Sequence, residues 1–481
     1  MPLSYSIQNE SKRVLVEGIL QNPLFHDLPE DARALADNYL PIKGLEAIMT
    51  SLLLKKKYGV EPRKVVINTD RAQLFIMSTF IQTIDPREDA APVEPSDLLT
   101  LQAKVNKYFP NCEIHNMGSS SRFPGFPHDR PEIKTAEESW LPFIEKIAQF
   151  DSEEIETLAN DKYRQAGTIC WSPEDYEASE QGKANAHVGL YEIFHHPHED
   201  KGPTWWNDSP ETELAELGAS VLRVTAPHIA DFSALHSDLN WGKWNAHLDL
   251  RKEEDKETLH QLILESDIVI DGHRPGVMDK WGFGKDDVLK IAKERKRGII
   301  YMRENCYGWN GPWWYRSGWQ PISDANTGVA MGYGRAMGHE EAVVPVLPNS
   351  DYCTGVVGAA AAIHALLKRS QEGGSYSIDI ALNYYNRWLV KFVGSYPEDV
   401  YMVWTMPRLL GMMVKAGTDG IFLLEHFEVR TSKAIGAQIK TVKPVIKYVN
   451  GPVELKFRVG TRGNGVDKPR WPEYLSTEII E

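Results

Sequence analysis

Residues 267–304 read DIVIDGHRPGVMDKWGFGKDDVLKIAKERKRGIIYMRE, and this stretch decides the class of fold. The runs DIVID and GIIYM are short, apolar and rich in β-branched residues, which predicts two buried strands. The segment between them is long enough to hold a helix. A strand, a helix and a second strand of these lengths are typical of a parallel pair joined by a crossover helix.

The same alternation extends toward the N-terminus. GASVLRV (218–224) and NAHLDL (245–250) predict two more strands, and residues 253–266 predict a helix. The expected fold class is therefore α/β, with a mostly parallel sheet covered by helices. Ligands of such folds bind at the carboxyl ends of the strands, so the loops after Val224, Asp271 and Arg303 are candidate site loops.

The first part of the chain predicts a smaller, mainly helical α+β domain. Leu45, Ile48 and Leu52 follow one helical face, and a short strand is expected at 64–69. A helical stretch is expected at 139–165, after an exposed loop at 113–135. Residues 196–212 combine proline, glycine and charge without periodicity. We therefore divide the chain into a helical domain (1–185), a linker (186–212), the sheet domain (213–395) and a C-terminal segment (396–481).

Composition disfavours several classes of function. The 481 residues carry a formal net charge of -14, which argues against nucleic acid as a partner. The cysteines at 112, 170, 306 and 353 have no paired spacing, so neither a disulfide framework nor a zinc site is predicted. No secretory signal or membrane-length apolar run is visible. We therefore expect a cytoplasmic protein that binds neither a metal nor a membrane.

Two loops carry side chains suited to ligand binding. Arg274 and Lys280 flank a Pro-Gly turn after the strand at 267–271, where two solvated cations are the simpler interpretation and a phosphate site is the alternative. The loop 304–312 contains glycines but lacks the spacing of a nucleotide-binding fingerprint. Trp319 belongs to an aromatic group that is typical of a core or interface, or of the wall of a cofactor channel.

Asp351 precedes a run of small residues, TGVVGAAAAIHALLKR, that predicts a closely packed helix. Aspartate is a favoured N-cap, so capping is the simplest interpretation. The alternative is a nucleophile, because the positive end of a helix favours an ionised carboxylate that can attack an acyl group. The histidines of HHPH (195–198) are interpreted as loop residues and Cys353 as a small buried residue.

Taken in order, these segments resemble the family III coenzyme A transferases, the CaiB/BaiF family. The matching blocks are LGASVLRV (217–224), NWGK (240–243) with LDL (248–250), DIVIDGHRPG (267–276), GFG (282–284), GWNGP (308–312) and Asp351 ahead of Thr354-Gly355. The resemblance implies a Rossmann-like domain that binds coenzyme A as a substrate, with no tightly bound cofactor. It also implies an interlocked homodimer.

The resemblance further implies roles for single residues. Asp351 stands at the position of the family's carboxylate nucleophile, which reacts with an acyl-CoA and then carries coenzyme A as an aspartyl thioester until a small carboxylic acid accepts it. The residues implied to lie beside coenzyme A are Lys243, His273, Arg274, Lys280 and Trp319.

Two alternatives stay open. A related acyl-CoA racemase would need a histidine within 317–321, where this chain has Trp319 and Gln320, and tryptophan cannot shuttle a proton at neutral pH. The other alternative is a non-catalytic member that binds coenzyme A. It arises because the family carries a strand and an R-x-x-A-G-P-like loop before its first matched strand, and residues 186–212 contain no counterpart.

Overall fold

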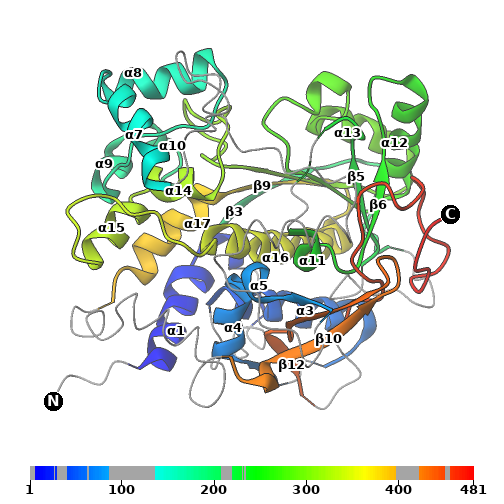
Figure 1. The fold of residues 1–481 in the computed structure, drawn as a ribbon. Coiled ribbons are helices and arrows are strands. Elements are labelled where there is room, and N and C mark those ends of the chain that lie inside the picture. The colour runs from blue at the N-terminus through cyan, green and yellow to red at the C-terminus, as the bar shows by residue number, and fades with distance from the viewer. Residues whose placement is uncertain are drawn as a thin grey trace.

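The computed structural model of the chain describes residues 6–26, 28–29, 41–61, 64–85, 136–206, 219–229, 231, 235–396, 422–449 and 455–481. The loop expected at 113–135 and the start of the first matched block at 217–218 lie outside these residues. Figure 1 shows a long central helix, α16 (Asn349–Glu372), with elements from both ends of the chain around it.

A four-stranded sheet of order β3-β9-β8-β7 lies against this helix. Strands β7 (Ile268–Asp271), β8 (Ile300–Asn305) and β9 (Ser375–Ala381) are parallel. Helix α13 (Lys285–Ile291) lies in the connection from β7 to β8, and α12 (Glu253–Glu265) precedes β7. The strand-helix-strand pattern of residues 267–304 is therefore confirmed, because local periodicity and burial point to the same elements.

Part of the segment predicted as a linker is a strand instead. β3 (Tyr191–His196) pairs antiparallel with β9 at the edge of the sheet. The interpretation of the first two histidines of HHPH as loop residues is therefore wrong. His195 stacks on Tyr376 with ring centroids 4.7 Å apart, and Nε2 of His196 lies 2.9 Å from Oγ of Ser377. Backbone pairing with the buried β9 decides the conformation here, although β3 ends in two histidines.

The two upstream strands form a sheet of their own. β5 (Val221–Thr225) and β6 (Lys243–His247) are parallel neighbours, joined through α11 (His236–Leu239). Both predicted strands are present, and β6 begins two residues earlier than expected. The expectation of a single parallel sheet is wrong, since the structure places these five parallel strands in two sheets.

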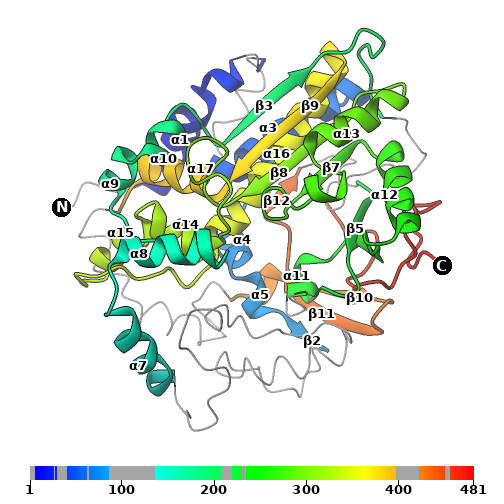
Figure 2. The same cartoon turned by 90° about the horizontal axis from the view of Figure 1, so that it is seen from above.

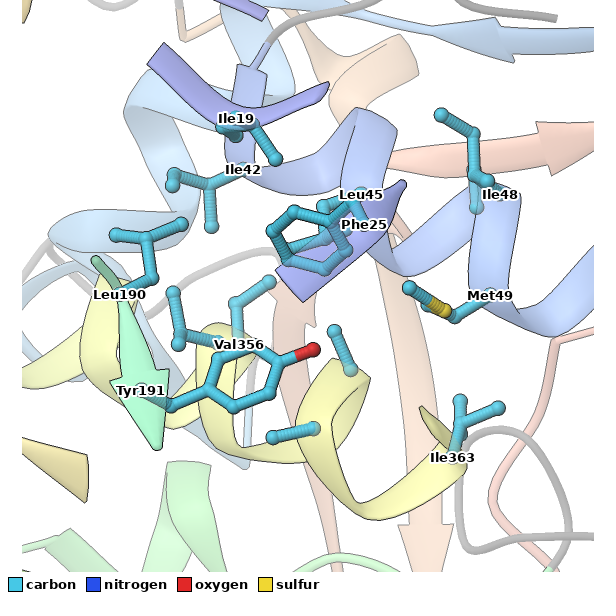
Figure 3. Close-up of a cluster of buried hydrophobic side chains, with 14 of the residues drawn as sticks. Ile19, Phe25, Ile42, Leu45, Ile48, Met49, Leu190, Tyr191, Val356 and Ile363 are labelled. Carbon is cyan, nitrogen blue, oxygen red and sulfur yellow. The ribbon is translucent and has the colours of Figure 1, made fainter. Parts of the chain in front are cut away.

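Helix α16 is the centre of the largest apolar core. On one side, a Cβ at Gly358 would lie 3.1 Å from Cδ1 of Ile380, so the helix sits directly on the sheet. On the other side it packs against α3 (Pro41–Tyr58), and Figure 3 shows Leu45 and Met49 of α3 facing the same cluster as Val356. The N-terminal helices and the central sheet therefore share one core. α16 is long and apolar enough to cross a membrane, but 72% of its most apolar window is buried inside the fold.

Two small sheets connect the beginning of the chain to its end. β1 (Val65–Ile67) pairs antiparallel with β12 (Ile446–Tyr448). β2 (Thr83–Ile84) pairs with β11 (Ala437–Val442), which pairs in turn with β10 (Phe427–Ser432). The strand expected at 64–69 is thus confirmed, and its partner comes from the C-terminal segment.

The remaining helices lie on either side of the central sheet. Figure 2 shows α8, α9, α10, α14 and α15 gathered to one side of the central sheet, and α12 with α13 beyond its other side. Their bounds are α1 (Ile7–Leu15), α4 (Thr69–Ile76), α5 (Ser78–Ile81), α7 (Ala136–Ile147), α8 (Ser152–Thr157), α9 (Pro173–Ala178), α10 (Glu180–Ala184), α14 (Gln320–Asn326), α15 (Val329–Ala336) and α17 (Leu382–Trp388). The helix predicted at 139–165 is thus divided, mainly into α7 and α8.

Candidate active site

Asp351 is the third residue of α16 and not its N-cap. The cap position is Pro348, which offers no side-chain hydrogen bond, and the amide of Tyr352 donates to the carbonyl of Pro348 at 3.2 Å. The capping prediction is therefore wrong, since the helix starts three residues earlier than expected. The Asp351 side chain is consequently not needed to close the helix end, and the residue is exposed.

The direction of α16 brings Asp351 to the carboxyl end of β8. The helix ends at Glu372, just before β9 begins, so it runs back along the sheet. A Cβ at Gly358 would lie 3.6 Å from Sδ of Met302, which shows that Met302 of β8 points at the helix. Seven residues from Gly358 back to Asp351 cover about 10.5 Å toward the carboxyl end of the strand.

Glu304 meets Asp351 at this edge. It lies two residues after Met302 on the same face of β8, about 6.6 Å further along the strand. Burial raises the pKa of Glu304 to about 7, and the charge of Asp351 adds to this rise. The charges of the two side chains therefore interact where β8 ends and α16 begins.

Asp324 of α14 is the third carboxyl group of this site. Although Asp351 is exposed, neighbouring segments displace enough water to raise its pKa to about 6, and the charge of Asp324 adds to this effect. Asp351 thus ionises first, and its charge then opposes ionisation of Glu304. At neutral pH Asp351 is mostly charged while Glu304 is close to its midpoint. In the described part of the chain, no lysine or arginine forms an ion pair with any of the three.

Hydrogen bonds to Asp324 fix the first turn of α16. Its buried carboxylate accepts from Nδ2 of Asn386 at 2.8 Å, from Oγ of Ser350 at 3.2 Å and from Nε2 of Gln320. These donors come from α17, α16 and α14. Burial also raises the pKa of Asp324. The network holds Ser350, and therefore the adjacent Asp351, in a set position at the sheet edge.

The loop after β7 lies at the same edge as Glu304, because β7 and β8 are parallel neighbours. His273, Arg274 and Lys280 are all exposed there. The amide and Nδ1 of His273 both lie 3.0 Å from Oδ1 of Asp271, which orients the loop. Neither Arg274 nor Lys280 has an ion-pair partner among the residues that are described, so both cations are available to an anionic ligand.

Trp319 and Lys243 occupy different surroundings. Trp319 is the N-cap residue of α14, the helix that carries Asp324, and is 40% exposed. Lys243 begins β6, donates from Nζ to the carbonyl of Leu239 at 2.7 Å, and has a pKa lowered to about 8, mainly by burial. The charge of Asp238 acts on Lys243, and Asp238 also accepts a hydrogen bond of 2.9 Å from the hydroxyl of Tyr352. Lys243 thus approaches α16 from the β5–β6 side, apart from the loop that holds Arg274.

The sequence did not single out Glu304 and Asp324. Glu304 had one usable signal, an acidic residue closing a predicted buried strand at the start of a candidate loop. Asp324 had none, because an aspartate within a short polar helix is ordinary. The residues that the structure describes contain no group of three or more His, Cys, Asp or Glu side chains that could hold a metal ion.

Comparison with known proteins identifies the family. The sequence model described as CoA-transferase family III matches residues 211–393. Acetyl-coenzyme A transferase nodX of Hypoxylon pulicicidum is 38% identical over 563 aligned positions, which cover 99% of this chain and 95% of that protein. An acyl-CoA transferase of Gibberella moniliformis is 32% identical, over 66% of this chain and 63% of its own length. The chain therefore belongs to the family III coenzyme A transferases and is an enzyme of that class.

Solved structures show a partial likeness. A CAIB/BAIF family protein from Brucella suis matches 47% of this chain and 60% of its own length, with a TM-score of 0.32 and 21% identity. The alignment with nodX spans 563 positions against the 481 residues here, so that relative contains segments without a counterpart in this chain.

Proposed function

We propose that this enzyme transfers coenzyme A from an acyl-CoA to a carboxylic acid through a thioester on Asp351. The observation that carries the proposal is an exposed carboxylate at the start of α16 with a pKa of about 6 and no ion pair to any lysine or arginine that the structure describes. Such a group is ionised at neutral pH and free to act as a nucleophile. The β7–α13–β8 unit beside it supports a Rossmann-like domain for coenzyme A.

The first half of the reaction places coenzyme A on the enzyme. An oxygen of Asp351 attacks the donor thioester carbonyl, the C–S bond breaks, and a mixed anhydride and the thiolate of coenzyme A result. The thiolate then attacks the aspartyl carbonyl, and the donor acid leaves as a carboxylate when the C–O bond breaks. The product is an aspartyl thioester, formed without net consumption of a proton.

The second half reverses these steps with another acid. The acceptor carboxylate attacks the aspartyl thioester and expels the thiolate, which then attacks the acceptor carbonyl of the new anhydride. Asp351 leaves as a carboxylate and is regenerated. Water must be kept from the anhydrides and the thioester, since hydrolysis would waste each of them.

Two features support transfer over the alternatives. Gln320 donates to Asp324 and so serves the carboxyl network, at a place where a racemase would need a proton-shuttling histidine. The relative named an acetyl-coenzyme A transferase covers nearly the whole chain, which supports an active enzyme and makes acetyl-CoA the first donor to test.

Mass spectrometry of the Asp351 peptide tests the proposal. After incubation with acetyl-CoA and rapid acid quenching, we expect the mass of coenzyme A on this peptide, and its loss when acetate or another acid is added. The Asp351→Asn variant should form no adduct. Stabilisation by coenzyme A without any adduct, across a panel of acyl-CoAs, would instead identify a non-catalytic binding protein.

We also propose that the enzyme is a homodimer, as the resemblance implies. Sedimentation at nanomolar concentration should then show a particle of twice 54.4 kDa. An interlocked dimer does not dissociate on dilution, so a monomer at that concentration would contradict this assembly.

A further inference from the structure

Gly355 is a glycine that α16 does not need for its own structure. It lies in the interior of the helix, one turn after Asp351, where glycine weakens a helix relative to alanine. Its backbone is not among those with positive φ, so a side chain would be tolerated. A Cβ at this position would meet no described atom within 4 Å. Neither backbone geometry nor internal packing therefore explains the missing side chain.

Gly358, on the same helix, is a glycine that close packing requires. A Cβ there would lie 3.1 Å from Cδ1 of Ile380 and 3.6 Å from Sδ of Met302, so the sheet forbids a larger residue. Gly358 is buried, whereas Gly355 is exposed. Close packing therefore explains the glycine at position 358 but not the glycine three residues earlier, at position 355.

The open space at Gly355 adjoins the carboxylate of Asp351. Residues four apart on a helix are neighbours, with Cβ atoms about 5–6 Å apart. Helical side chains also tilt toward the N-terminus, so a side chain at 355 would lie over the turn that carries Asp351. Ala359, a further turn along the same stripe, is exposed as well.

An apolar side chain of the sheet is exposed on the face that carries α16. Ile270 of β7 is in register with Met302, so both point to the face of the sheet on which α16 lies. Ile270 is 64% exposed, although strands of a parallel sheet are usually covered on both faces. The face of the sheet that carries α16 thus has an exposed isoleucine, and the helix has a stripe of exposed small residues that begins one turn after Asp351.

We infer that Gly355 leaves room for the acyl group while its thioester carbonyl reacts at Asp351, and that it thereby limits the size of acyl group the enzyme accepts. Short and medium aliphatic acyl chains are the class that this small-residue and isoleucine surface suits. The inference rests on the proposed function of Asp351 and names the substrate feature that the same site selects.

The test compares Gly355→Ala and Gly355→Leu with the wild type on acetyl-CoA and hexanoyl-CoA. We expect Gly355→Leu to lower kcat/KM for hexanoyl-CoA relative to acetyl-CoA by about tenfold or more, the scale of a lost pocket. Gly355→Ala should show a smaller change of the same sign. Neither variant should lower the unfolding temperature, since both residues form helices better than glycine.

Gly332→Leu is the matched control. Gly332 lies within α15, has no positive φ, and also has open space at its Cβ, so the substitution is alike but distant in sequence from the nucleophile. It should leave the ratio of the two donors unchanged. An unchanged ratio in Gly355→Leu, with the Asp351 adduct still formed, would overturn the inference alone. Absence of the adduct in the wild type would instead overturn the proposed function.

Discussion

The carboxylates of two regions of this protein have opposite surroundings, and the pKa values of Asp231 and Asp351 shift in opposite directions. Around β5 and the C-terminal tail, the carboxylates of Asp231 and Asp467 are paired with arginines. Burial would raise the pKa of Asp231, but hydrogen bonds from His236 and Asn464 and the charge of Arg223 lower it well below its usual range. Asp467 and Arg462 form an ion pair of 3.1 Å with both side chains fully buried. At the carboxyl end of the central sheet, Asp351, Asp324 and Glu304 have raised pKa values.

This difference distinguishes carboxylates that stabilise the fold from carboxylates that can take part in a reaction. A paired carboxylate stabilises the fold but has its lone pairs occupied, so it is a poor nucleophile. An unpaired carboxylate costs stability and stays reactive. Among the described residues, Asp231 and Asp467 are paired with cations, whereas Asp351, Asp324 and Glu304 form no ion pair at the edge where the family likeness also places its nucleophile.

The largest effect is expected from Asp351→Asn. Turnover should fall by on the order of 10³-fold or more, because the amide cannot form the anhydride or the thioester. Affinity for coenzyme A should stay nearly unchanged, as measured by calorimetry. Because Asp351 does not cap the helix, Asp351→Ala should be as inactive and about as stable as the asparagine variant. Substantial turnover in either variant would refute the assignment.

Arg462→Ala should have the largest effect on stability. It leaves Asp467 buried without its cation, which costs about 3–5 kcal/mol of unfolding free energy. Urea unfolding measures the loss. Arg251→Ala is the control, because Arg251 pairs with Asp249 at 2.7 Å but its side chain is 57% exposed, so its removal should cost much less unfolding free energy. Equal losses in the two variants would contradict the distinction between the regions.

An intermediate effect is expected for the exposed cations of the β7 loop. Arg274→Ala and Lys280→Ala should each weaken binding of coenzyme A by roughly 1–3 kcal/mol, the scale of a charge-assisted hydrogen bond. Lys243→Ala should weaken it as well if its ammonium turns from the Leu239 carbonyl to phosphate. Lys290→Ala, on the exposed side of α13, is the control. Unchanged dissociation constants in Arg274→Ala and Lys280→Ala would exclude a phosphate site in this loop, and an unchanged constant in Lys243→Ala would exclude a phosphate contact of Lys243.

The smallest effect is a shift in pH dependence. The nucleophile works when ionised, so activity should rise with pH through the Asp351 pKa of about 6. Asp324→Asn removes a negative neighbour, which lowers that pKa and moves the acidic limb of kcat/KM to lower pH. Ser350→Ala removes a hydrogen bond to Asp324 without changing its charge, so the limb should stay in place. A limb that stays in place in Asp324→Asn would mean that burial alone sets the pKa of Asp351.

The sequence predicts the elements of this fold better than their partners. The β7–α13–β8 unit and the small-residue helix follow from local periodicity, and the resemblance adds Asp351. The cap at Pro348 was missed because the helix starts before its first favourable capping residue. The sequence does not predict β3, because histidines are not typical of a strand and the conformation of this segment depends on pairing with β9. Asp324 and Glu304 join Asp351 through packing of distant segments, which local patterns do not encode.

The pairing of β1 with β12, and of β2 with β11, has a consequence for biosynthesis. Val65 and Thr83 leave the ribosome long before Tyr448 and Lys440, their partners in the sheets. The early strands cannot complete these ladders until Lys440 and Tyr448 have been synthesised, and such long-range closure is slow. Strands β11 and β12 therefore close the fold around α16 only after Tyr448 has been synthesised.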